Sequence, residues 1–235
     1  MRVVVTRPQA DAERTAAAVR ARGHDVLVTP LMRVEPIAVD LGGSWSALAI
    51  TSANAPGAIA RNPTRDTLLR LPLLAVGRRS AEAAQQAGFA DVTSADGDVR
   101  ELVRLIEASR RKGEGPVLYL AGEDRASDLV AELSARGIAV EMRVVYRAVT
   151  TPLPGSLVDA LKAGEVDAVL HFSRRSAENY VAGAKRAGIV GPALAVRHLC
   201  LSAQVAEPLT GASHIMIAAR PDEATLIELL PMGPG

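Results

Sequence analysis

Short runs of apolar residues alternate along the chain with longer segments in which apolar residues recur at helical spacing. Ala12, Ala16 and Val19 recur three and four residues apart, so residues 10–21 are predicted to form a helix. The continuous apolar runs are typical of strands buried on both faces. Strands are therefore predicted at 3–5, 25–29, 47–51, 73–76, 117–120, 139–145, 168–172, 194–196 and 214–218. Strands alternating with helices indicate an α/β fold whose parallel sheets are covered on both faces.

The pattern occurs twice in the chain. When the two halves are laid on one another, Val4 falls on Leu118 and Gly23 falls on Gly137. The matching segments are 3–32 with 117–146, 47–52 with 168–173, and 71–76 with 191–196. Because the three matches keep nearly one register, we infer that one unit was duplicated. The expected architecture is two similar three-layer α/β domains with parallel sheets.

Two stretches have the character of linkers. Residues 30–36 begin and end with proline, which favours extended backbone, and residues 144–150 are the β-branched counterpart in the repeat. If both cross between the domains, they can pair as a two-stranded β linker. The tail, residues 231–235, is expected to be disordered.

Composition and charge remove several classes of function. The formal net charge is +1, which argues against a nucleic-acid binder, and aromatic residues make up 3% of the chain, too few for a stacking platform. A single cysteine excludes a disulfide framework. No apolar stretch has the length of a signal sequence or a membrane span, so we expect a cytoplasmic protein with no membrane partner.

Searches for metal and cofactor motifs are negative. The four histidines are scattered, and neither a phosphate-binding loop nor a dinucleotide-binding glycine motif follows a predicted strand. No metal and no cofactor are therefore expected. His171 lies in an apolar strand and is interpreted as a satisfied core histidine, and Cys200 has no base beside it in the sequence and is interpreted as inert.

Candidate chemistry sits where predicted strands end and helices begin. Each of five such turns offers threonine, serine or glycine: 6–8, 51–54, 77–80, 121–123 and 173–176. For any one turn, helix N-capping is a sufficient explanation. Together the turns would bring amides and hydroxyls to one edge of each sheet, where anions bind readily. Arginines in or beside these turns either add positive charge there or form a solvated face: Arg7, Arg78, Arg79, Arg174 and Arg175. A ligand with several carboxylates or phosphates fits this layout.

Five short motifs follow one another along the chain: residues 5–8 (VTRP), 50–55 (ITSANA), 75–77 (AVG), 145–146 (VY) and 172–173 (FS). Their order and spacing resemble the uroporphyrinogen-III synthase family over nearly the whole chain. The resemblance implies two α/β domains joined by a two-stranded linker. It also implies an interleaved chain, in which 1–35 plus 150–235 form one domain and 36–149 form the other.

The resemblance further implies an activity. Members of this family cyclise hydroxymethylbilane, a linear tetrapyrrole polycarboxylate, with loss of water and inversion of the terminal ring, and they use no cofactor or metal. The implied partner is this small molecule, and the enzyme that makes the bilane is a candidate protein partner. We expect a monomer.

The resemblance also points to site residues. Tyr146 would donate a proton to the leaving hydroxyl, since phenols are protonated at neutral pH; a purely structural linker tyrosine is the alternative. Residues expected to hold substrate carboxylates are Arg7, Thr51, Ser52, Asn54, Gly77, Gly122, Ser173 and Arg197. One departure from the family pattern occurs after Ala195-Val196. The hydroxyl-bearing turn expected there is replaced by residues 197–200 (RHLC), where Arg197 or His198 could supply a cation instead.

Two other functions stay open at this stage. The departure at 197–200 allows a tetrapyrrole-binding or regulatory relative that has lost activity. A binding protein or transferase for another polyanion, such as a nucleotide sugar, would also fit the turns, although the missing phosphate loop speaks against it.

Overall fold

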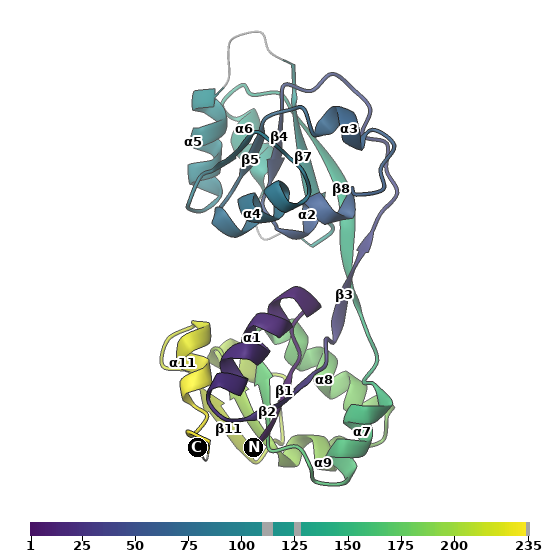
Figure 1. The fold of residues 1–235 in the computed structure, drawn as a ribbon, viewed down its shortest axis with the longest axis vertical. Helices are drawn as coiled ribbons and strands as arrows, with labels where there is room; N and C mark the ends of the chain where they lie inside the picture. The colour runs from purple at the N-terminus through teal and green to yellow at the C-terminus, as the bar shows by residue number, and fades with distance from the viewer. Residues whose placement is uncertain (110–114, 125–127, 234–235) are drawn as a thin grey trace. The chain divides into compact units, whose positions relative to one another are not determined.

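The computed structural model describes residues 1–109, 115–124 and 128–233, and the chain divides into two compact units (Figure 1). Unit 1 comprises Met1–Arg33 with Val149–Gly235, and unit 2 comprises Val34–Ala148. The boundaries expected from the family resemblance were 1–35 with 150–235, and 36–149. Unit 1 is thus built from both ends of the chain, and unit 2 is one continuous segment.

Unit 1 contains a five-stranded parallel sheet in the order β11-β10-β9-β1-β2. Its strands are β1 (Arg2–Val5), β2 (Asp25–Val28), β9 (Ala168–His171), β10 (Arg197–Cys200) and β11 (His214–Ile217). Its helices are α1 (Gln9–Ala21), α7 (Gly155–Lys162), α8 (Arg174–Arg186), α9 (Val190–Ala195), α10 (Ala203–Ala206) and α11 (Glu223–Glu228).

Side chains alternate between the two faces of this sheet, as the period of a strand requires. Val4 and Val169 pack in one cluster with residues of α7, α8, α9 and α10. Val3 and Val5 pack in the other with residues of α1 and α11. Both faces are therefore buried, and unit 1 has three layers.

Unit 2 contains a six-stranded sheet in the order β3-β8-β7-β4-β5-β6. Its strands are β3 (Met32–Pro36), β4 (Ala47–Ile50), β5 (Leu73–Ala75), β6 (Val92–Ser94), β7 (Val117–Gly122) and β8 (Val140–Thr150). Its helices are α2 (Asn54–Ala58), α3 (Arg65–Leu68), α4 (Arg78–Gln86), α5 (Val99–Ser109) and α6 (Leu129–Ser134). Leu118 and Leu120 of β7 face α2, α3 and α4, whereas Val117 and Tyr119 face α5 and α6.

The duplication inferred from the sequence is visible in the topology. The order β11-β10-β9-β1-β2 of unit 1 is matched by β6-β5-β4-β7-β8 of unit 2. Gly23 and Gly137, which are matched in the repeat, have positive φ angles of 81° and 71°, and they follow the ends of helices α1 and α6. The predicted fold class, two similar three-layer α/β domains with parallel sheets, is confirmed.

The two linker segments pair with each other. β3 lies beside β8 in the sheet order, and the backbone amide of Ile37 donates to the carbonyl of Val145 at 2.8 Å. At the other end, the amide of Thr151 donates to the carbonyl of Leu31 at 3.0 Å, so the pair runs antiparallel. The predicted strand 139–145 and linker 144–150 are in fact one continuous strand, β8.

The prediction of a strand at 194–196 is wrong. These residues end helix α9, and the strand is β10, which begins at Arg197. The matching of 71–76 with 191–196 fails for the same reason, because β5 corresponds to β10 in the sheet order. A short apolar run is compatible with either a strand or the buried end of a helix. The true strand, β10, was not recognised because it begins with an arginine and a histidine.

The tail was expected to be disordered, but its described residues, 231–233, make hydrogen bonds to the rest of unit 1. The carbonyl of Pro231 bonds to His24 Nε2 at 2.7 Å, and the amide of Gly233 donates to the carbonyl of Arg22 at 2.9 Å. These two bonds tie the tail to the end of α1. Residues 234–235 lie outside the described residues.

A buried pair of histidines sits in the core of unit 1. His171 Nε2 and His198 Nδ1 are 3.0 Å apart, and the Tyr180 ring packs against both imidazoles at interplanar angles of 71° and 68°. His171 Nδ1 has no partner among the described residues, so His171 is not the fully satisfied core histidine that was expected. Burial lowers the pKa of His198 to about 4, and burial together with His198 lowers the pKa of His171 well below its ordinary value.

Nearby, burial raises the pKa of the Cys200 thiol to about 12, which agrees with its interpretation as inert.

The histidine pair predicts acid sensitivity. Below pH 6.5 the unfolded chain binds protons that the buried imidazoles cannot accept. The free energy of unfolding therefore falls as the pH drops toward 4, by up to about 1.4 kcal/mol per pH unit for each histidine. Urea unfolding at a series of pH values measures this slope. We expect His198→Gln to make it shallower and exposed His214→Gln to leave it unchanged. Equal slopes in all three proteins would contradict the assignment.

Candidate active site

Most of the predicted site residues lie at the carboxyl ends of the strands of unit 2. Residues 51–54 follow β4, Gly77 follows β5, Gly122 ends β7, and Tyr146 lies in β8 beside it. Because β4, β5, β7 and β8 are parallel, these positions belong to one edge of the sheet. This is the edge at which open α/β sheets bind ligands.

Some of the polar groups in the turn after β4 form hydrogen bonds within unit 2 and are not available to a ligand. Thr51 Oγ1 shares a hydrogen bond of 2.9 Å with the phenol of Tyr119, a buried residue of β7. Ser52 Oγ accepts the backbone amide of Asn54 at 3.2 Å and keeps its own proton available. The side-chain amide of Asn54 is exposed and makes no hydrogen bond within the described ranges. Ser52 and Asn54 can therefore bind a carboxylate, whereas Thr51 mainly fixes the turn.

The turn after β5 leaves open space. Gly77 is the N-cap of α4, with an extended backbone at φ −159° and ψ 168°, and a Cβ built there would meet no atom within 4 Å. The carbonyl of Gly77 accepts the amides of Ser80 and Ala81, which starts the helix. Glycine is not needed here for backbone or packing reasons, so the helix start is open to approach by a ligand.

A β-bulge in β8 sets the position of Tyr146. Ala121 of β7 pairs with Val144 and Gly122 pairs with Tyr146, so Val145 is the extra residue. The amide of Glu123 donates to the carbonyl of Tyr146 at 2.9 Å just after the bulge. Bulges re-aim side chains and are common beside active sites. Here the bulge brings both Val145 and Tyr146 to the face covered by α2 and α4.

Gly122 makes room for the phenol of Tyr146. A Cβ on Gly122 would lie 2.6 Å from Cζ and 2.7 Å from the hydroxyl oxygen of Tyr146. The tyrosine is 9% exposed, and its hydroxyl forms no hydrogen bond with any of the residues that the structure describes. Gly122 was predicted to hold a carboxylate. Its geometric role is to admit the ring whose hydroxyl stays unpaired at the edge of the sheet.

The turn after β9 in unit 1 is a helix cap. Ser173 Oγ accepts the amide of Ser176 at 3.1 Å, and the amide of Ser173 donates to Ser176 Oγ at 3.3 Å. This reciprocal pair is a capping box, which starts α8. The capping explanation is therefore correct for Ser173, although its hydroxyl proton remains able to reach a ligand.

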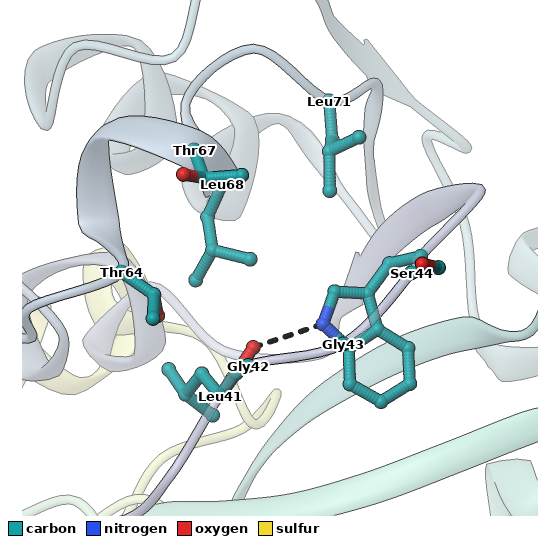
Figure 2. A pocket seen from close by; sticks show the side chains of 9 residues that line it. Leu41, Gly42, Gly43, Ser44, Thr64, Thr67, Leu68 and Leu71 are labelled. Carbon is teal, nitrogen blue, oxygen red and sulfur yellow. Dashed lines mark hydrogen bonds between the residues drawn. The ribbon is translucent and has the colours of Figure 1, made fainter.

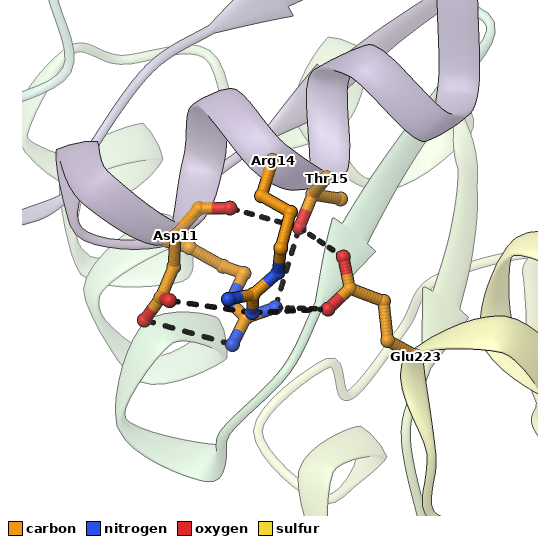
Figure 3. A network of polar contacts seen from close by, with 5 residues as sticks. Asp11, Arg14, Thr15 and Glu223 are labelled. Atoms are coloured by element: carbon orange, nitrogen blue, oxygen red, sulfur yellow. Dashed lines mark hydrogen bonds and ion pairs between the residues drawn. The ribbon is translucent and has the colours of Figure 1, made fainter. Parts of the chain in front are cut away.

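Arg7 contacts a network of charged and polar side chains, of which Figure 3 labels Asp11, Arg14, Thr15 and Glu223. Its guanidinium donates to Glu223 Oε2 at 2.9 Å and to Thr15 Oγ1 at 3.2 Å. A second nitrogen lies 3.6 Å from Asp11 Oδ2, and Arg14 reaches the same Glu223 oxygen at 3.3 Å. The network joins the turn after β1 and helix α1 to helix α11.

This network changes the interpretation of Arg7. Only 15% of its side chain is exposed, and the guanidinium also lies 4.2 Å from the centre of the Phe172 ring. Burial alone would raise the pKa of Glu223, but the bonds from Thr15 and Arg7 outweigh it and the pKa is lowered. Glu223 is thus held charged beside the guanidinium of Arg7. Arg7 therefore connects elements within unit 1. Because its guanidinium is occupied by these contacts, its geometry does not support the predicted contact with a substrate carboxylate.

The placement predicted for Arg197 at the carboxyl end of a strand is wrong. Arg197 opens β10 and therefore lies at the amino end of the strand, near Met1, away from the carboxyl edge. The turn that follows β10 contains Ser202, the N-cap of α10, whose side chain makes no capping bond. Its backbone angles of −158° and 169° match those of Gly77 in unit 2. Sequence reasoning missed Ser202 because the strand was placed too early.

A hollow of about 510 Å³ in unit 2 lies elsewhere (Figure 2). Its lining comes from the segment before β4 and from α3 with the loop leading to β5, which are the amino ends of those strands. It contains none of the predicted site residues. The lining residues are Leu41, Gly42, Gly43, Ser44, Trp45, Thr64, Thr67, Leu68 and Leu71.

The described part of the chain contains neither a cluster of metal ligands nor a helix that could span a membrane. Residues 1–109, 115–124 and 128–233 hold no group of three or more potential metal ligands. Within those same ranges no helix has the length and apolar character needed to cross a bilayer.

The contact between Gly122 and Tyr146 predicts a coupled pair. Gly122→Ala forces the phenol ring to move, so the free energy of unfolding should fall by about 1–3 kcal/mol. In a Tyr146→Ala background the same substitution should cost much less, because the ring is gone. Urea unfolding of the four proteins measures the coupling.

Gly77→Ala is the matched control, since its Cβ meets open space and stability should change by no more than about 0.5 kcal/mol. Additive effects of the Gly122 and Tyr146 substitutions would contradict the proposed close approach.

Comparisons with known proteins give the same picture of the fold. The structure is similar to a uroporphyrinogen-III synthetase from Helicobacter pylori, with a TM-score of 0.65, 20% identity, and coverage of 97% of this chain and 98% of that one. It is also similar to a mutant uroporphyrinogen III synthase from Thermus thermophilus, with a TM-score of 0.52, 21% identity and coverage of 97% of each chain. A search of curated proteins finds no significant match.

The family assignment rests on the sequence itself. The family model described as uroporphyrinogen-III synthase HemD matches residues 13–228, which is nearly the whole chain. That span includes the turns after β4 and β5, the bulge in β8 and the capping box of α8. The chain belongs to the uroporphyrinogen-III synthase family, an enzyme family of tetrapyrrole biosynthesis.

Proposed function

We propose that this protein is a lyase that converts hydroxymethylbilane into uroporphyrinogen III, with loss of water and inversion of the terminal pyrrole ring. The observation that carries the proposal is the Tyr146 hydroxyl, held by the bulge and by the space at Gly122 without a hydrogen-bond partner among the described residues. An unpaired phenol at the ligand-binding edge of a parallel sheet is suited to donate a proton to a leaving group.

The reaction begins with loss of the hydroxyl group of the bilane. Tyr146 donates its phenolic proton to that oxygen, the carbon–oxygen bond breaks, and water leaves with an azafulvene cation remaining. The substituted carbon of the terminal ring attacks this cation to give a spiro intermediate. The spiro intermediate then fragments, and the macrocycle closes through the other α-carbon of the terminal ring. The proton released at this closure restores the phenol of Tyr146.

The protein's main contribution is to hold a flexible, highly charged chain in the geometry that favours ring inversion. In unit 2, the Ser52 hydroxyl, the Asn54 amide and the open helix start at Gly77 are candidate carboxylate contacts. In unit 1, the hydroxyls of Ser173 and Ser202 are the corresponding groups, and Ser202 replaces Arg197 in the proposal.

The alternative of a relative that has lost activity rested on the missing hydroxyl after Ala195-Val196. Residues 197–200, on which it rested, lie in strand β10, and the turn that follows has Ser202 at the place that Gly77 has in unit 2. The product isomers distinguish this alternative from an active enzyme. The nucleotide-sugar alternative gains no support from the turns, because no glycine-rich phosphate loop occurs in the chain.

The ratio of product isomers tests the activity. Freshly made hydroxymethylbilane is incubated with and without the protein, the products are oxidised, and the type I and type III uroporphyrins are separated by chromatography. We expect type III to exceed type I when the protein is present, and type I to dominate without it. A product mixture containing only type I in both samples would overturn the proposal.

The proton donor is tested by Tyr146→Phe. Removal of the hydroxyl should lower kcat by about 10²-fold and leave KM within about twofold, because the phenol acts on the leaving group and not on the carboxylates. Tyr180→Phe is the control, since the Tyr180 hydroxyl donates to the carbonyl of Ala193 in the core of unit 1. An unchanged kcat in Tyr146→Phe would assign Tyr146 a purely structural role.

A further inference from the structure

Strand β11 presents an uncovered apolar edge. It is the last strand of the sheet of unit 1 and pairs on one side with β10. Ile215, Met216 and Ile217 are 40%, 39% and 46% exposed, and together with Met232 they are the exposed large hydrophobic side chains among the described residues. Three consecutive residues point to alternating faces of the sheet, so solvent reaches both faces at this edge.

Such an edge is normally protected. Proteins block free strand edges with charged residues, proline, bulges or very short strands, because unpaired backbone groups recruit other strands. β11 contains no Asp, Glu, Lys, Arg or Pro, and its register with β10 is regular over all four residues. Its outward backbone groups are therefore available to a further strand.

The other sheet edges in the described ranges show the usual protection. β2 begins with Asp25, and β3 contains Arg33 and Glu35. β6 occupies in unit 2 the place that β11 has in unit 1, yet it has three residues, a polar centre at Thr93, and aspartates on either side of it. Because the duplicated fold gives both strands the same position, the fold does not require β11 to be apolar.

We propose that β11 is a self-association edge, through which two copies of this chain pair antiparallel and join their unit 1 sheets into one. This inference does not depend on the proposed function. It departs from the monomer that the sequence analysis predicts.

A second copy is the partner that fits best because β11 is complementary to itself. In an antiparallel pair centred on Met216, Ile215 of each copy lies opposite Ile217 of the other, and His214 lies opposite Ala218. No charged residue faces a like charge, and the nearest basic side chain, Arg220, is already paired with Asp222 at 3.3 Å. A twofold axis of this kind makes one surface patch its own partner, and an antiparallel pair at the edge of a parallel sheet is common.

The expected dimer is weak. A strand of four residues offers few backbone hydrogen bonds, and three side chains per copy bury less surface than a stable interface needs. Association should therefore depend on protein concentration.

Sedimentation equilibrium from about 5 µM to about 500 µM tests the proposal, since weak homodimers dissociate in this range. The average mass of the wild-type chain should rise from 24.6 kDa toward twice that value. Met216→Lys and the milder Ile215→Thr should reduce the association, by placing a charge or a polar group at the edge. Amide hydrogen exchange at β11 should slow as the wild-type protein is concentrated.

Thr93→Lys, at the equivalent edge of unit 2, is the matched control and should associate like the wild type. A wild-type mass of 24.6 kDa at every concentration would overturn the proposal, as would equal association of the Met216→Lys and wild-type chains.

Discussion

Each sheet in this protein is parallel in its central strands and covered by helices on both faces, and this burial decides where polar chemistry can occur. Val3, Val4 and Val5 are fully buried in turn on opposite faces of one strand, so the body of the sheet has no room for a polar ligand. Hydroxyls and free amides are left to the turns that follow the strands. The groups proposed to act on the substrate come from these turns and from the bulge beside one of them.

Much of the fold could be predicted because burial on both faces leaves a strong mark on the sequence. Continuous apolar runs identified most of the central strands, and the repeat predicted two similar domains, which in the structure share one sheet order. The wrong strand at 194–196 and the failed match of 71–76 with 191–196 have one cause: Arg197 and His198 open a central strand, while the apolar residues before them end a helix. The buried histidine pair, which makes such a strand possible, depends on a contact between distant segments that no local pattern reports.

The sequence predicted which turns could form a site, but not the contacts that each of their residues makes. Thr51, Ser173 and Arg7 were found because they sit in turns, yet each is engaged in bonds that hold its own unit together. Gly122 was found as a turn glycine, but its function follows from the extra residue in β8 that places the ring of Tyr146 against it. Register shifts between strands leave no periodic signal, so this contact was visible only in three dimensions.

The interleaved chain has a consequence for synthesis on the ribosome. Unit 2 is one continuous segment, Val34–Ala148, and can form its contacts as soon as it has emerged. Strand β1 is the first to be made, yet it lies between β2 and β9, and β10 and β11 follow later still. The earliest strand must therefore wait, with an apolar face unburied, while the middle of the protein folds. During translation the sheet that starts first is completed last.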